Sequence, residues 1–181
     1  VWGAVRGTSA EKRALIAGYK AELTPERLRE ADLPRGRALF DRACAPCHRL
    51  YDAGGDVGPD ITGSNRHNLD YLLENILDPS AQVGREHLLQ AVRTRDGRLI
   101  SGIIRERTER GLVVQTPNER LALGRSEIRD ITPLAVSMMP EGALEQLTRE
   151  EVRDLIAYLS SQAQVPLPDL RPGGPGDGRP R

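Results

Sequence analysis

The spacing of apolar residues predicts two amphipathic helices. They recur at intervals of three and four in two sets: Leu69, Leu72, Leu73 and Ile76, then Val152, Leu155, Ile156 and Leu159. An α-helix brings such positions onto one face. Asn68 can cap the first helix and Asp78-Pro79 ends it, while Thr148 and Glu151 are spaced as a capping box before the second.

The beginning of the chain also has a helical pattern. Residues 1–33 suggest two helices, one headed by a capping box at Thr8 and one started by Thr24 with proline at the first helical position. The segment 36–44 (GRALFDRAC) predicts a further short helix. Residues 52–67 contain four glycines and a proline, which predicts a loop.

The pattern changes to strands after Gly84. HLLQAVRTR and RLISGIIRER flank Asp96-Gly97, which is a strong turn signal for a β-hairpin. The further strand candidates are LVVQT (112–116), RLALG (120–124) and SEIRDI (126–131). So many short strands in one stretch predict a small, strongly curved sheet or barrel.

Composition excludes several classes of protein. Lys and Arg number 26 against 26 Asp and Glu, and this balance argues against nucleic-acid binding. The two cysteines are too few for a disulfide scaffold, and no apolar run approaches the ~20 residues of a membrane span. One Trp, four Tyr and one Phe are few for 181 residues, so another group could help to fill the core.

The strongest chemical signal is Cys44-Ala45-Pro46-Cys47-His48. C-x-x-C-H is the attachment sequence of c-type haem: two thiols on one turn bond the porphyrin, and the next residue, His48, ligates the iron. Three other interpretations compete. A thioredoxin-like redox pair expects a βαβ context that is missing here, a zinc site lacks a second cysteine pair, and a chance match is the third.

A six-coordinate haem needs a second axial ligand, which is usually Met or His. The only methionines are Met138 and Met139, in a Ser-Met-Met-Pro segment before the last predicted helix. His67 and His87 are the remaining histidines, and nothing around them in the sequence suggests a ligand. No Ser/His/Asp set, carboxylate pair or phosphate loop stands out.

The chain resembles class I cytochromes c in the order of its motifs: the C-x-x-C-H sequence, a Gly-Pro loop, and a Met-Pro segment before the last helix. Gly36 and Phe40 match first-helix positions that pack on the last helix, where Leu155 and Tyr158 match their partners. Gly58-Pro59 matches the loop whose proline carbonyl accepts a hydrogen bond from the proximal histidine. The resemblance favours Met139 over Met138 as the distal ligand. More narrowly, the chain is similar to the planctomycete-type haem-binding CxxCH domain, which shares GPDITG, YLLENILDPS, TRDGR and SMMPEG.

The resemblance implies a mainly α cytochrome c fold with a small β insertion between the middle helix and the methionine loop. The expected organisation is a helical extension (1–31), a cytochrome c domain (32–164) with the insertion at 81–131, and a disordered Pro/Gly-rich tail (165–181). The insertion could cap the haem or dock a partner.

The implied function is one-electron transfer by a single covalent haem c with His48 and Met139 as axial ligands, in a protein that is not itself an enzyme. Cys44, Cys47 and Pro59 would complete the binding site, and Arg66 or Tyr51 could bind a haem propionate. A dehydrogenase donor, a cytochrome or oxidase acceptor and a periplasmic or otherwise extracytoplasmic location are expected. The alternatives are a gas sensor or peroxidase-like domain with a labile Met, and a structural module without haem.

Overall fold

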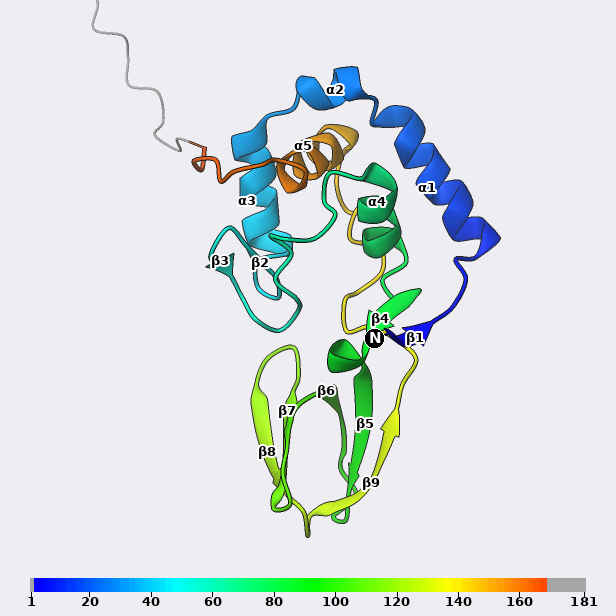
Figure 1. The fold of residues 1–181 in the computed structure, drawn as a ribbon, viewed down its shortest axis with the longest axis vertical. Coiled ribbons are helices and arrows are strands. Elements are labelled where there is room, and N and C mark those ends of the chain that lie inside the picture. Colours follow the sequence, from blue (N-terminus) through cyan, green and yellow to red (C-terminus); the bar gives the residue numbers. More distant parts are fainter. Residues whose placement is uncertain (1, 169–181) are drawn as a thin grey trace, which may run out of the picture.

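A computed structural model describes residues 2–168, so most of the expected tail, 169–181, lies outside the described residues. The chain forms a helical lobe and a sheet lobe (Figure 1). The helices are α1 (Ala10–Glu22), α2 (Pro25–Arg29), α3 (Leu33–Ala43), α4 (Leu69–Leu77) and α5 (Arg149–Leu159). The sheet lobe contains β5 (Leu89–Thr94), β6 (Leu99–Arg107), β7 (Gly111–Gln115), β8 (Arg120–Gly124) and β9 (Ile128–Pro133). The shorter elements are β1 (Trp2–Val5), β2 (Arg49–Leu50), β3 (Ala53–Gly54), β4 (Gln82–Gly84) and the 3₁₀ turn η1 (Arg85–His87).

Side-chain caps start the helices where the local sequence predicts them. Thr24, Asn68 and Thr148 accept hydrogen bonds from the first turns of α2, α4 and α5, and Thr148 forms the complete capping box with Glu151. The predicted start of α1 at Thr8 is wrong by one residue. Ser9 is the N-cap, whereas the Thr8 hydroxyl donates to Glu74.

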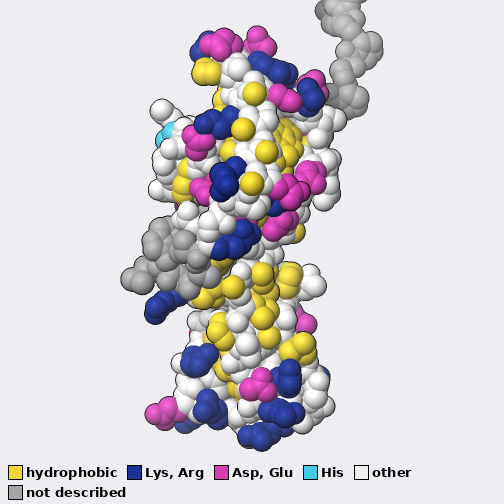
Figure 2. All heavy atoms as spheres, turned by 90° about the vertical axis from the view of Figure 1, so that its right-hand side faces the viewer, with side chains coloured by type: hydrophobic (Ala, Val, Ile, Leu, Met, Phe, Trp, Pro, Cys, Tyr) yellow, Lys and Arg dark blue, Asp and Glu magenta, His cyan; other side chains and the backbone are white. Residues whose placement is uncertain are grey.

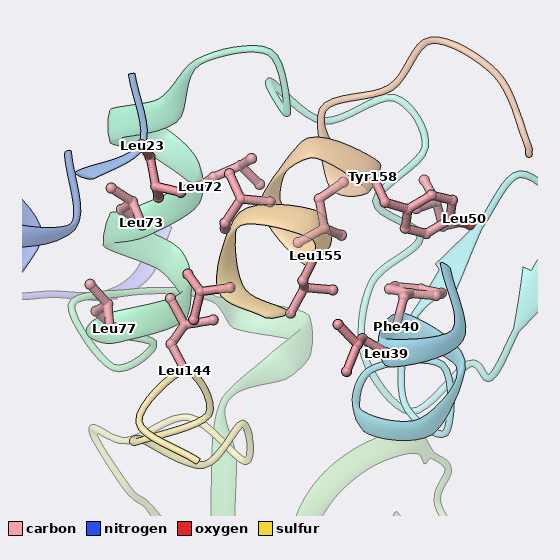
Figure 3. Packing of buried hydrophobic residues seen from close by; sticks show 13 residues of the cluster. Leu23, Leu39, Phe40, Leu50, Leu72, Leu73, Leu77, Leu144, Leu155 and Tyr158 are labelled. Carbon is pink, nitrogen blue, oxygen red and sulfur yellow. The ribbon is translucent and has the colours of Figure 1, made fainter. Parts of the chain in front are cut away.

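The helical lobe is built on the contact between α3 and α5. Gly36 allows this contact, since a Cβ atom there would lie 2.1 Å from the Asp154 carbonyl oxygen. One turn later the rings of Phe40 and Tyr158 meet at 5.7 Å between centroids, and both are fully buried. The resemblance predicted this packing and it is confirmed. Figure 3 shows Leu72 of α4 directed toward α5 from the other side.

The predicted strands are confirmed and form one antiparallel sheet in the order β8-β7-β6-β5-β9. The Asp96-Gly97 turn closes the first hairpin, in which Arg93 pairs with Leu99, and Gly97 has a φ of 95°. The last strand, β9, returns to pair with β5. One face of the sheet encloses its own small core of Val92, Leu112, Val114, Leu123 and Ile128.

The expectation of a mainly α cytochrome c fold is wrong. The protein is 32% helical and 24% strand, with a five-stranded antiparallel sheet, so it belongs to a mixed class. The strands were recognised in the sequence, but they were treated as an insertion although they form a lobe with its own core. The sheet also runs past the expected limit at 131, because β9 ends at Pro133.

The first residues differ from the predicted helical extension as well. Trp2–Val5 forms β1, which pairs with β4 at the junction of the two lobes. Its partner strand lies about 80 positions further along the chain, so no local pattern indicates the pairing. Among the described residues, no helix is long and apolar enough to span a membrane.

Candidate functional site

Cys44, Cys47 and His48 lie on a single turn at the end of α3. Helix α3 ends at Ala43, and the Cys44 amide closes it by donating to the Phe40 carbonyl at 2.8 Å. The Cys44 carbonyl then accepts from the amides of both Cys47 (3.0 Å) and His48 (2.8 Å). All three side chains are half-buried. The core contact of Phe40 therefore fixes the place from which two thiols and an imidazole project.

A glycine-rich loop, residues 54–58, lies directly against this turn. A Cβ atom would lie 2.1 Å from the His48 carbonyl oxygen at Gly54, 2.3 Å from the Pro46 carbonyl oxygen at Gly55, and 2.6 Å from Cε1 of the His48 ring at Gly58. The sequence marked Gly54 and Gly55 only as turn residues, whereas Gly58 also belonged to the Gly58-Pro59 match of the resemblance. Of the three, Gly54 alone has a positive φ, so close approach is the main reason that glycine stands at the other two.

The loop also fixes the orientation of the imidazole. Nδ1 of His48 lies 3.0 Å from the carbonyl oxygen of Pro59, which confirms the contact that the resemblance implied. A carbonyl oxygen can only accept, so Nδ1 carries the proton and donates. Nε2 of the neutral ring is then left with its lone pair, the state in which histidine binds a metal.

The two cysteines are free thiols. Burial and, to a smaller extent, the nearby Cys47 raise the pKa of Cys44 to about 11. The Cys44 thiol is therefore protonated at neutral pH, whereas a redox-active pair depends on a stabilised thiolate. This disfavours the thioredoxin-like interpretation. Within residues 2–168 no three His, Cys, Asp or Glu side chains converge as a metal site.

Met138 and Met139 lie on a separate loop between β9 and α5, and both are half-buried. The Ser137 amide donates to the Ser80 hydroxyl just after α4, and the Met139 amide donates to the Ser137 hydroxyl, each at 3.1 Å. Leu144, further along the loop, is inserted into the helical core (Figure 3). The methionine loop is thus held by the segment after α4 and by the helical core.

Arg66 and Tyr51 both have partners elsewhere in the helical lobe. Arg66 is only 3% exposed and donates to the carbonyls of Leu159, Ser161 and Thr62. Its guanidinium also lies over the Tyr51 ring, 5.0 Å from the centroid. Arg66 therefore closes the C-terminal end of α5, whose last carbonyls have no partner within the helix. The expected contact of Arg66 with a haem propionate stays a prediction.

The other two histidines differ in their surroundings. Nδ1 of His67 lies 2.9 Å from the Ser160 carbonyl, so this ring also supports the end of α5. His87 lies in η1 at the junction of the lobes, and its pKa is lowered, mainly by burial. Glu86 opposes this lowering electrostatically, whereas Arg105 and His48 add to it.

Two arginines of the sheet hold the glycine loop, a role that the sequence did not indicate. Arg105 of β6 donates through Nη2 to the carbonyls of Asp56, at 2.6 Å, and Val57. Arg120 of β8 forms an ion pair with the Asp56 carboxylate. Figure 1 shows the loop reaching down to the upper end of the sheet. The sheet lobe is therefore attached to the loop that orients His48.

Comparison with known proteins adds no similar protein to the observations above. The chain matches no family model. A search of curated proteins also finds no similar protein.

Proposed function

We propose that Cys44, Cys47 and His48 hold one covalently bound haem c, and that the protein transfers single electrons. The observation that supports this most directly is the His48 ring, whose Nδ1 is engaged by the Pro59 carbonyl and whose Nε2 is left for a metal. The two free thiols on the same turn supply the attachment points. When bound, the haem iron would accept and release one electron at a time.

The residues of the site fit this group. Each protonated thiol can add its sulfur to one carbon of a vinyl group and its hydrogen to the other, forming a thioether without any oxidant or leaving group. The raised pKa of Cys44 is consistent with a thiol of this kind. The glycine at position 58 allows the loop to lie against the His48 ring and so holds the imidazole in one orientation.

Met139 is proposed as the second axial ligand, on the resemblance to class I cytochromes c. A thioether ligand would raise the reduction potential compared with two histidines. The same resemblance suggests a dehydrogenase as electron donor, a cytochrome or oxidase as acceptor, and a periplasmic location. The methionine loop is anchored at Ser80, which would limit its freedom to leave the iron.

A pyridine haemochrome assay tests the attachment. The protein should be produced with a c-type haem maturation system, denatured and extracted with acidified acetone. We expect the wild-type haem to stay with the polypeptide. The Cys44→Ser, Cys47→Ser double variant should release all of it, while Ser64→Ala should not release any. A wild-type protein without a haemochrome would refute the proposal.

A glycine pair tests the fit of the loop. Gly58→Ala places a methyl group against the His48 ring and should lower the haem content several-fold. Gly63→Ala, five residues further along the chain and with no atom within 4 Å of the added Cβ, is the matched control and should load normally. Equal loading of the two variants would show that the loop does not position the ligand.

The adjacent methionines test the axial ligand. Met139→Ala should abolish the long-wavelength charge-transfer band of the oxidised protein that arises from a methionine–iron bond. Met138→Ala should retain this band. Persistence of the band in Met139→Ala would contradict the assignment, and strong carbon monoxide binding by the reduced wild-type protein would favour a sensor instead.

A further inference from the structure

Two buried nitrogens at the junction of the lobes have no hydrogen-bond partner among residues 2–168. They are Nδ1 of His87, in η1, and Nε of Arg105, in β6. Leaving a buried polar group unpaired costs about 1–3 kcal/mol, so folded proteins rarely tolerate it. The Nε–H of arginine can only donate. The missing partner is therefore an acceptor.

Both groups lie where the sheet lobe meets the glycine-rich loop and η1. Nη2 of Arg105 is already bound to the carbonyls of Asp56 and Val57, which directly precede the glycine that packs on His48. The turn η1, which contains His87, packs against β6, which contains Arg105. Its other ring nitrogen, Nε2, faces the carboxylate of Glu86 at 3.9 Å, and Glu86 is 71% exposed. Nδ1 is thus the buried side of the ring.

We propose that His87 and Arg105 form a binding site for a carboxylate, and that this carboxylate is a propionate of the haem. The inference rests on the proposed function. A carboxylate has two acceptor oxygens, so one can accept from Nε of Arg105 and the other from Nδ1 of His87, in charge-assisted bonds. The imidazole would donate its Nδ1 proton to the propionate, with Nε2 on the side of Glu86. This is the role that the sequence suggested for Arg66, which the fold uses at the end of α5.

Resonance Raman spectroscopy of the haem-loaded, reduced protein tests the site, because the propionate bending band falls in frequency when its hydrogen bonds are lost. His87→Leu should lower this frequency, and Arg105→Lys, which removes Nε–H but keeps the charge, should lower it as well. His67→Leu is the matched control, since His67 binds the Ser160 carbonyl, and it should leave the band unchanged. Haem attachment should be complete in all three variants.

Two results would overturn the inference. One is a propionate bending band that has the wild-type frequency in both His87→Leu and Arg105→Lys. The other is a change of the ferric iron to high spin in His87→Leu, which would make His87 an axial ligand instead of a propionate partner. Absence of a haemochrome from the wild-type protein is a separate result that would refute the proposed function, and the carboxylate site with it.

Discussion

The two lobes are held together by cores of very different kinds. The helical lobe buries a cluster of 13 residues, which includes the aromatic pair Phe40 and Tyr158. The sheet lobe buries five aliphatic residues and no aromatic one. Buried apolar area is the main stabilising term, so the helical lobe should be the more stable of the two. The candidate attachment turn is built on the stronger core.

The contacts between the lobes around the glycine loop are mostly polar. Arg105 and Arg120 of the sheet bind backbone and side-chain oxygens at positions 56 and 57, and exposed ion pairs of this kind contribute little. Figure 2 shows further arginines around the free end of the sheet, away from this junction. Changes in one core should therefore be felt mainly in the same lobe.

Phe40→Ala should have the largest effect. It removes a fully buried ring between α3 and α5 and should cost about 4 kcal/mol of unfolding free energy. Urea unfolding measures the loss, and amide hydrogen exchange should show it first in α3 and α5. Tyr71→Ala, at a partly exposed aromatic residue of α4, should cost less than about 1 kcal/mol. Equal losses would mean that the α3–α5 contact is not the centre of the lobe.

Gly36→Ala should come next. The added methyl group would overlap the Asp154 carbonyl, so the two helices must separate, at a cost of about 2–3 kcal/mol. Gly18→Ala in α1 is the opposite case, since nothing lies within 4 Å of its Cβ position, and it should stabilise the protein by up to about 1 kcal/mol. Thermal unfolding measures both. A neutral Gly36→Ala would show that α3 and α5 do not approach as closely as described.

Val114→Ala tests the smaller core. It removes two methyl groups from a fully buried position in β7, which should cost about 2 kcal/mol. Exchange should accelerate in β6, β7 and β8, while amides of α5 keep their protection. Val136→Ala, at an exposed valine, is the control. Equally fast hydrogen exchange in α5 would show that the two lobes unfold as one unit and that a change in one core is not confined to its lobe.

The same contrast explains what the sequence could predict. The helix caps at Asn68 and Thr148 and the turn at Asp96-Gly97 are local signals, and the structure confirms the elements that they predict. The pairing of β1 with β4 is non-local, and no sequence pattern near Trp2 predicts it. The fold class was wrong for a different reason: the strands were identified, but their share of the chain and their separate core were underestimated.

The candidate site divides in the same way. The spacing of Cys44, Cys47 and His48 is visible in the sequence because one turn makes the site, and the Pro59 carbonyl followed from the resemblance. Arg66 was a plausible carboxylate partner by residue type, yet its burial against α5 depends on tertiary packing. Arg105 could not be singled out among the many arginines, because only the approach of the sheet to the loop distinguishes it.

The smallest effect is expected at the ion pair of Asp56 with Arg120. The hydrogen bond from Arg120 holds the pKa of Asp56 below its ordinary value of 3.8. A lowered pKa in the folded state stabilises the protein above the unfolded-state value, and this stabilisation is lost as the pH falls from about 3.8 through the lowered pKa. In urea unfolding, Arg120→Gln should therefore be slightly less stable than wild type at neutral pH, and the difference should vanish in strong acid. Arg107→Gln, with no ion-pair partner among the described residues, should show no such change. If the difference in unfolding free energy between wild type and Arg120→Gln does not depend on pH, the Asp56 carboxylate does not attach the sheet to the glycine-rich loop. The backbone contacts of Arg105 would then be the polar link there.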